Sequence, residues 1–342
     1  MRYADTRGTG NFVISDRDAR DHRGNSSMTS TRRVVLAGPI LALWTSMLII
    51  DVAAQSERPA IVGRWNITAA APDGGYPSWL EVQWSGNRTL VGHFVGPVGS
   101  ARPISKVEFT NNELRFSIPP QWERGNNDLR FEGKLDDGRL TGWMTDAAGS
   151  RLNWTANRAP ALRRTTPPKW GSPIALFNGT DTAGWQAPGE SQWRVVDHVL
   201  TNVKAGANLV TRQTFTDFKL HVEFRYPKGA NSGVYLRGRY EVQIEDTAGL
   251  EPASDRLGAV YGFLPPNEDA AKKPGEWQTF DITLVGRLVT VVLNGKAVIS
   301  GQEIPGITGG ALDSAEGAPG PLMLQGDHGP IEFRNIVLTP AK

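Results

Sequence analysis

The stretch Asn231–Asp246, which reads NSGVYLRGRYEVQIED, contains two short runs in which apolar and polar side chains alternate. A period of two sends successive side chains to opposite faces of a sheet, so this stretch predicts a β-hairpin, with its turn at Gly238-Arg239. One face of the hairpin is aliphatic, and the other is suited to binding a polyol. That second face carries Tyr235, Arg237, Glu241, Gln243 and Glu245.

The upstream segment Phe218–Tyr226 repeats the alternation and places Glu223 and Arg225 on one face. Neighbouring strands lie ~4.8 Å apart and same-face residues ~6.7 Å apart along a strand. If the two segments are neighbours, Glu223, Arg225, Arg237 and Glu241 would surround one small ligand. The alternative is a solvated sheet face with cross-strand ion pairs, each contributing ~0.2–1 kcal/mol. The pattern alone favours neither interpretation.

The composition narrows the class of protein. The chain has 342 residues, enough for two domains and an export segment. Its net charge of +2 comes from interspersed acids and bases, which argues against nucleic acid as a partner. The absence of cysteine excludes disulfides, thiol nucleophiles and cysteine-based zinc sites. The 38 glycines, 23 prolines and 11 tryptophans are typical of a turn-rich all-β protein.

The N-terminal residues predict export. Residues 1–27 are polar and aperiodic, so we interpret them as disordered or as a mis-called start before Met28. Residues 28–54 then have the order of a signal peptide, with Arg32-Arg33, the apolar run Val34–Ile50 and the small residues Val52–Ala54. We expect a periplasmic or secreted protein. An uncleaved membrane anchor is the alternative, and it too places the folded part outside the cytoplasm.

Two folded units follow. Residues 58–160 contain strand-like runs every 8–12 residues and predict an accessory β-barrel or sandwich domain. Residues 161–172 are a proline-containing linker. Residues 173–342 hold eleven short strand candidates without helices, which predicts a two-sheet sandwich. Tryptophans in such domains usually belong to the core, although exposed ones stack on sugars. Those of the first unit are Trp79, Trp84, Trp122, Trp143 and Trp154.

The second unit, about residues 173–340, resembles the 3-keto-disaccharide hydrolase domain family. The resemblance rests on motifs that occur in the family's order, among them Leu176–Gly179, Phe218–Arg225, Asn231–Gly238, Tyr240–Ile244, Leu324–Gly329 and Glu332–Ile336. It implies a concanavalin-like jelly-roll sandwich. It also implies a small carbohydrate substrate whose C3 has been oxidised by a separate oxidoreductase. For residues 1–170 there is no such resemblance.

The chemistry that the resemblance implies is removal of the C2 proton, elimination of the group at C1, and hydration. It needs a base, an acid and a group that stabilises the enolate. The candidates are Glu223 or Glu241 as base, His328 as acid, and Arg225 or Arg237 beside the enolate. Hydroxyl groups of the sugar would be bound by Asn231, Tyr235, Gln243 and Gln325.

A divalent metal is left open by the sequence. Some relatives are metal-assisted, and a bound cation would act as a Lewis acid. The candidate ligands are Glu241, His328 and Asp246. Each has an alternative, since Glu241 would also pair with an arginine, a lone histidine is usually solvated, and Asp246 suits a loop cap.

Three other functions are compatible with the fold. A non-catalytic carbohydrate-binding sandwich is the main alternative. A retaining glycosidase is disfavoured, because Glu241 and Glu245 would lie ~13 Å apart along a regular strand, whereas a retaining pair needs ~5–5.5 Å. A purely structural envelope protein leaves the polar hairpin face unexplained.

Overall fold

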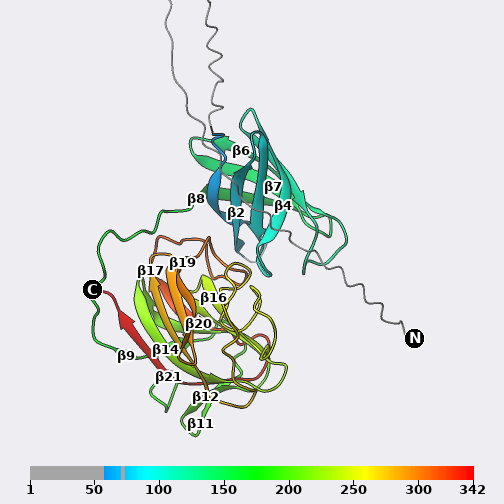
Figure 1. The fold of residues 1–342 in the computed structure, drawn as a ribbon. Coiled ribbons are helices and arrows are strands. Elements are labelled where there is room, and N and C mark those ends of the chain that lie inside the picture. Colours follow the sequence, from blue (N-terminus) through cyan, green and yellow to red (C-terminus); the bar gives the residue numbers. More distant parts are fainter. Residues whose placement is uncertain (1–57, 71–73) are drawn as a thin grey trace, which may run out of the picture. The chain divides into compact units, whose positions relative to one another are not determined.

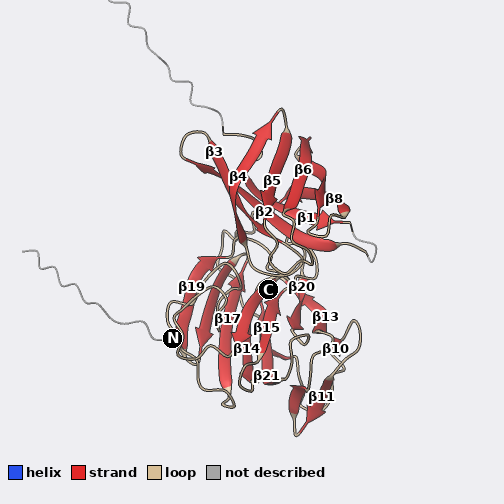
Figure 2. Ribbon diagram, turned by 90° about the vertical axis from the view of Figure 1, so that its right-hand side faces the viewer, coloured by secondary structure: helices blue, strands red, loops and turns tan. Residues whose placement is uncertain are grey.

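The computed structural model describes residues 58–70 and 74–342, and these fall within one compact unit, Ser56–Lys342. The segments predicted as a disordered start and as a signal peptide lie outside the described residues. Within the described part the fold is all-β, and Figure 2 shows strands and loops but no helix there. No helix of this part is long and apolar enough to cross a membrane.

The first part of the chain folds into a closed barrel in which each strand pairs antiparallel with the next and the last closes on the first. Its inward-facing side chains form their own core, which includes Leu80, Val82 and Phe131. In sequence order the barrel strands are β1 (Gly63–Ala69), β2 (Tyr76–Ser85), β3 (Thr89–Val95), β4 (Arg102–Thr110), β5 (Glu113–Ile118), β6 (Leu129–Asp136), β7 (Arg139–Thr145) and β8 (Arg151–Arg158).

The second part is a sandwich of two sheets (Figure 1), which confirms the predicted sandwich preceded by a smaller β domain. The first sheet has the order β10 (Trp185–Gln186), β13 (Leu209–Phe215), β20 (Gly320–Leu324), β15 (Asn231–Leu236) and β16 (Tyr240–Glu245). The second has the order β11 (Trp193–Val196), β12 (Val199–Asn202), β21 (Ile331–Pro340), β14 (Phe218–Arg225), β17 (Gln278–Val285), β18 (Leu288–Leu293) and β19 (Lys296–Glu303), with β9 (Ile174–Ala175) paired to β21.

The alternation in the sequence decides which side chains fill the space between the sheets. From the second sheet Val222 and Phe224 are fully buried there, and from the first sheet Val234 and Val242 meet them. The next residues along each strand point away from this core, because successive side chains alternate between faces. The two polar faces therefore lie on the outer sides of two different sheets.

The barrel packs on the sandwich through an outward-facing tryptophan. Leu80 and Val82 of β2 point into the barrel, so Trp79 points out of it, and it is completely buried in the core cluster of the sandwich. Its ring meets Phe263 edge-on at a centroid distance of 5.3 Å. Removing so large a buried ring costs about 3–5 kcal/mol. Through this packing Trp79 of the barrel becomes part of the hydrophobic core of the sandwich.

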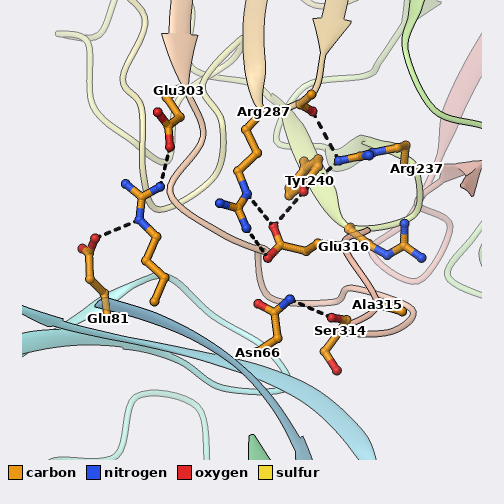
Figure 3. Close-up of polar contacts among 12 residues, drawn as sticks. Asn66, Glu81, Arg237, Tyr240, Arg287, Glu303, Ser314, Ala315 and Glu316 are labelled. Atoms are coloured by element: carbon orange, nitrogen blue, oxygen red, sulfur yellow. Dashed lines mark hydrogen bonds and ion pairs between the residues drawn. The ribbon is translucent and has the colours of Figure 1, made fainter. Parts of the chain in front are cut away.

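Polar contacts surround the same interface (Figure 3). Arg64 of β1 binds Glu81 of β2 at 2.9 Å and Glu303 of β19 at 2.6 Å. Nearby, the Asn66 side-chain amide donates to the Ser314 carbonyl oxygen at 2.9 Å. These directional contacts fix the orientation in which the apolar surfaces meet.

Candidate functional site

The hairpin β15–β16 forms one wall of a cavity of about 680 Å³. Its two strands pair in a register that sets Tyr235 opposite Glu241 and Gly233 opposite Gln243. The turn starts one residue earlier than predicted, because Arg237 and Gly238 both have positive φ, of 53° and 67°. Six predicted site residues line the cavity: Asn231, Tyr235, Glu241, Gln243, Gln325 and His328.

Two loops pair with the free edge of the hairpin, and residues of both line the cavity. The loop 255–264 runs along β16, where the Tyr261 backbone N–H donates to the Glu241 carbonyl oxygen at 3.0 Å. Along the same edge, the backbone N–H of Glu241 donates to the Thr308 hydroxyl at 3.0 Å. As a result Glu241 is only 4% exposed.

Burial changes the acidity of the Glu241 carboxyl. Loss of hydration, followed by the charges of Asp327 and Glu245, raises its pKa from 4.5 to about 8, although the nearby Tyr235 hydroxyl opposes the rise. About one molecule in ten then carries the ionised carboxylate at pH 7. A group with a pKa near the working pH is suited to take up and release protons.

Gly233 makes room for this carboxyl group. A Cβ atom at Gly233 would lie 2.9 Å from Cγ and 3.0 Å from Cδ of Glu241. Contacts this short do not occur, so any side chain at position 233 would displace Glu241. The glycine of the sequence NSGVYLRG is therefore required by the carboxyl group on the paired strand.

Tyr235 lies beside Glu241 and is fixed by a third loop. Its hydroxyl donates to the Gly309 carbonyl oxygen at 3.0 Å, and its side chain is 2% exposed. Burial, together with the charge of Glu241, raises the pKa of Tyr235 well above 10. Tyr235 therefore stays neutral and acts as a hydrogen-bonding group.

His328 and Asp327 form a pair at the open side of the cavity, where each side chain is about half exposed. The imidazole Nδ1 lies 2.6 Å from a carboxylate oxygen of Asp327, and this contact raises the pKa of His328 above 6.5. The carboxylate thus stabilises the imidazolium form of His328. A protonated His328 is a proton donor that reaches into the same cavity as Glu241.

Two buried amides in the wall have unused hydrogen-bonding capacity. Gln243 and Gln325 are 2% and 8% exposed, and neither side-chain oxygen meets a donor among the described residues. The Gln243 amide nitrogen has only a long contact of 3.4 Å to the Asp255 carbonyl oxygen. Because buried polar groups normally have partners, these amides suit a ligand rich in hydroxyl groups.

The expectation that Glu223 and Arg225 join Glu241 around one ligand is wrong. β14 pairs with β17 and β21 of the eight-stranded sheet, whereas β16 belongs to the other sheet. Glu223 binds the Arg334 guanidinium at 2.7 Å, and Arg225 pairs with Glu332. This face corresponds to the alternative of a sheet face with cross-strand ion pairs.

Arg237 and Asp246 are also absent from the cavity wall. Arg237 lies in the turn of the hairpin, where its guanidinium donates to the Tyr240 hydroxyl at 2.9 Å and to the Gly286 carbonyl oxygen (Figure 3). The strict alternation fails there because the positive φ of Arg237 redirects the side chain. Asp246 accepts a hydrogen bond from the Gly229 backbone at 2.8 Å and so acts as a loop cap.

Other lining residues were not predicted. They are Val98, Gly99, Asp255, Tyr261, Gly309, Gly310 and Asp327. Asp327 lies within the quoted motif Leu324–Gly329, which could have pointed to it. The others come from loops without any periodic pattern, and two belong to the barrel. Glu245 of the polar hairpin face and Trp122, one of the barrel tryptophans considered for stacking on sugars, also line the cavity.

The proposed metal ligands do not come together. Among residues 58–70 and 74–342 there is no group of three or more His, Asp or Glu side chains arranged to hold an ion. Asp246, the third candidate, caps a loop outside the cavity wall. The donor set therefore does not fit a bound cation.

Comparison with known proteins gives a family match for the sandwich. Residues 172–339 match the family described as the 3-keto-alpha-glucoside-1,2-lyase-like domain. A comparison with curated proteins finds no match.

Solved structures resemble parts of the chain. Two candidate glycosyl hydrolases from Parabacteroides distasonis are each 28% identical to this chain. The match to the first covers 52% of this chain and 93% of that protein, with a TM-score of 0.42. The match to the second covers 49% of this chain and 98% of that protein, with a TM-score of 0.41. A carbohydrate-binding module from Bacillus subtilis is 12% identical over 45% of this chain and 93% of its own, with a TM-score of 0.33. With TM-scores this low, these likenesses add nothing on function.

Proposed function

Because residues 172–339 form a domain of the 3-keto-alpha-glucoside-1,2-lyase-like family, we propose that this protein cleaves the glycosidic bond of 3-keto-glycosides by elimination. One observation carries the proposal: Glu241 is a buried carboxyl group with a pKa of about 8 in the wall of a 680 Å³ cavity. That pKa suits a general base near neutral pH. The cavity has room for a small glycoside.

Glu241 is the base that starts the reaction. The ketone at C3 acidifies the hydrogen on C2, and the carboxylate of Glu241 removes that proton to leave an enolate. When the C3 carbonyl re-forms, a double bond forms between C2 and C1, and the bond from C1 to the leaving oxygen breaks. Atoms and electrons balance without an oxidant or a reductant.

His328 is the acid that protonates the leaving oxygen. Its hydrogen bond with Asp327 favours the imidazolium form. Water then adds to the C1–C2 double bond: its hydroxyl goes to C1, the imidazole of His328 takes up the remaining proton of that water, and a proton delivered to C2 yields the free 3-keto sugar. Glu241, which holds the abstracted proton, is placed to return it to C2.

Neutral groups bind the sugar and its enolate. No arginine or lysine lines the cavity among the described residues, so the stabilising donors are hydroxyl and amide groups. Tyr261 and the amides of Gln243 and Gln325 provide such donors in a partly dry site. Donors fixed by the fold stabilise a developing oxyanion more strongly than water does, because they need not reorganise.

The proposal also places the protein in a sequence of reactions. Its substrate requires a separate oxidoreductase that oxidises C3 of the parent glycoside. The apolar run Val34–Ile50 after Arg32-Arg33 supports export, so we propose that the protein acts in the periplasm or outside the cell.

The test compares a chromogenic 3-keto-glucoside with its unoxidised parent, using the purified protein. We expect turnover of the keto form alone. The Glu241→Gln variant should lose turnover but still bind the keto substrate, measured by calorimetry. Glu276→Gln, which changes an exposed carboxylate in a turn of the same domain, is the matched control and should behave as the wild type.

Two results would overturn the proposal. Equal cleavage of both substrates would identify an ordinary glycosidase. Binding of the keto substrate without turnover by the wild type would make the sandwich a carbohydrate-binding module.

A further inference from the structure

Trp122 has an exposed aromatic ring that is not part of the barrel core. It is 66% exposed, and the other tryptophans of the barrel that face a core are buried, as Trp65 and Trp154 are. A large apolar side chain left in solvent is informative when it borders a cavity. Trp122 lines the same cavity as Glu241, although the two residues come from different parts of the chain.

The loop that carries Trp122 is fixed by a buried ion pair. Arg102, which is 8% exposed, binds Glu123 at 2.7 Å. The Glu123 carboxylate accepts hydrogen bonds from the backbone N–H groups of Gln121 at 2.7 Å and Trp122 at 3.2 Å. The ring is therefore held in place by its backbone even though its own surface is free.

A neighbouring loop supports the ring from behind. The Gln121 side chain exchanges hydrogen bonds with Ser100 at 3.0 and 3.2 Å. Gly99 lies so close that a Cβ there would be 2.7 Å from Cδ1 of Trp122. The tryptophan ring thus rests on a glycine, which leaves its opposite side open.

The same supporting loop touches the part of the sandwich that holds Tyr235. The Gly310 backbone N–H donates to the Pro97 carbonyl oxygen at 2.8 Å. The preceding residue, Gly309, accepts the hydrogen bond from the Tyr235 hydroxyl. A short series of contacts therefore positions the barrel's ring relative to the catalytic wall.

We propose that Trp122 is the stacking platform for the group attached to the reacting sugar ring, so that the barrel sets the choice of glycoside. This inference rests on the proposed function. With the reacting ring against buried Glu241, a second ring extends toward the exposed side of the cavity and meets the indole face. An aromatic face binds the apolar face of a sugar or an aryl group, and it offers nothing to a methyl group of small area.

The experiment measures KM for two 3-keto-glucosides, one with a glucosyl or aryl leaving group and one with a methyl group. Trp122→Ala should raise KM about tenfold for the first, equivalent to about 1.4 kcal/mol, and leave KM for the methyl glycoside within twofold. Trp122→Phe should restore most of the affinity. The matched control is Trp143→Ala, which removes a partly exposed barrel tryptophan that stacks on Arg151 away from the cavity.

A second measurement separates this inference from the proposed function. Calorimetric binding of an unoxidised disaccharide needs no turnover, and Trp122→Ala should weaken that binding about tenfold as well. Weakened binding with no cleavage of any 3-keto-glycoside would sustain the platform and refute the lyase. Equal effects of Trp122→Ala on both substrates, or no effect on either, would refute the platform while leaving the lyase intact.

Discussion

Glu241 and Glu223 occupy strands with the same alternation of apolar and polar residues, and the fold gives them opposite environments. Loops cover the face that carries Glu241, and burial raises its pKa to about 8. Partial burial also works to raise the pKa of Glu223, but hydrogen bonds from Asn335 and Arg334 outweigh it and hold that pKa below 4.5. One carboxyl group is thus mostly protonated at neutral pH, and the other is ionised.

The difference comes from what lies over each sheet. The outer face of the eight-stranded sheet carries Arg225 and Arg334 on neighbouring strands, and both guanidinium groups stack on Trp277. Cations there stabilise Glu223 as an anion. Over the hairpin, the loop 255–264 brings Asp255 and Tyr261 to the cavity, and its one cation, Arg256, does not line the cavity, so no cation there stabilises the charged form of Glu241.

The largest expected effect is on kcat, and it distinguishes the carboxyl group of Glu241 from that of Glu223. Glu241→Gln keeps the shape of the side chain and removes the base, so kcat for the chromogenic 3-keto-glucoside should fall about 10³-fold. Glu223→Gln should change kcat less than about twofold, because that side chain lies on the other sheet. Steady-state kinetics of the two variants decide the point, and a large loss in Glu223→Gln with an active Glu241→Gln would reverse the assignment.

His328 sharpens the comparison, because it supplies the proton that Glu241 does not. His328→Asn should lower kcat about 10²-fold for a sugar leaving group and much less for 4-nitrophenol, whose oxygen needs no protonation. The plot of kcat/KM against pH for the His328→Asn variant should keep only its rising limb, which passes through about pH 8 as Glu241 ionises. His198→Asn, at an exposed position with a φ of 63° that asparagine tolerates, is the control. Equal losses with both leaving groups would remove His328 from the role of acid.

Gly233 tests whether the position of the buried carboxyl group matters. Gly233→Ala should place a methyl group against Glu241 and lower kcat about tenfold while the protein stays folded. Gly184→Ala is the control, since a Cβ at that position meets only one atom within 4 Å, at 3.8 Å, and the residue has an ordinary φ. Unchanged kinetics in Gly233→Ala would mean that Glu241 can move without loss.

Local pattern predicted the elements of this fold well, because alternation reports which side of a strand is apolar. It predicted the extent of β14 almost to the residue, it predicted that β15 and β16 form a hairpin, and it placed Tyr235, Glu241 and Gln243 on one face. The two-residue strands β9 and β10 were not predicted, since a pair of residues carries no period.

Alternation does not tell which strands become neighbours. Glu223 and Glu241 have equivalent patterns, and their separation into different sheets depends on pairings between residues far apart in the chain, such as Glu223 with Thr279 and Arg334. The same limit left Trp122 undistinguished among the five tryptophans of the first unit, because its place in the cavity depends on how the barrel packs against the sandwich through Trp79. Long-range packing of this kind leaves no periodic signal in the sequence.

The smallest expected effect is on stability, and its sign differs between the two acids. The folded-state pKa of Glu241 is raised, so the folded protein binds a proton that the unfolded chain has lost between about pH 4.5 and pH 8, and stability falls as pH rises through that range. The Glu241→Gln variant does not undergo this loss of stability. The difference between its melting temperature and that of the wild type should therefore increase by a few degrees from pH 5 to pH 8 and then stay constant.

Glu223 has a lowered folded-state pKa, so its contribution is present above about pH 4.5 and is lost on acidification. Glu223→Gln should therefore melt slightly below the wild type by a constant amount between pH 5 and pH 8, corresponding to less than about 1 kcal/mol for a partly exposed pair. Thermal unfolding of both variants across this range measures the two trends together. Parallel behaviour of the two variants would mean that the Glu241 carboxyl is hydrated, and it would remove the physical basis for its role as a base near neutral pH.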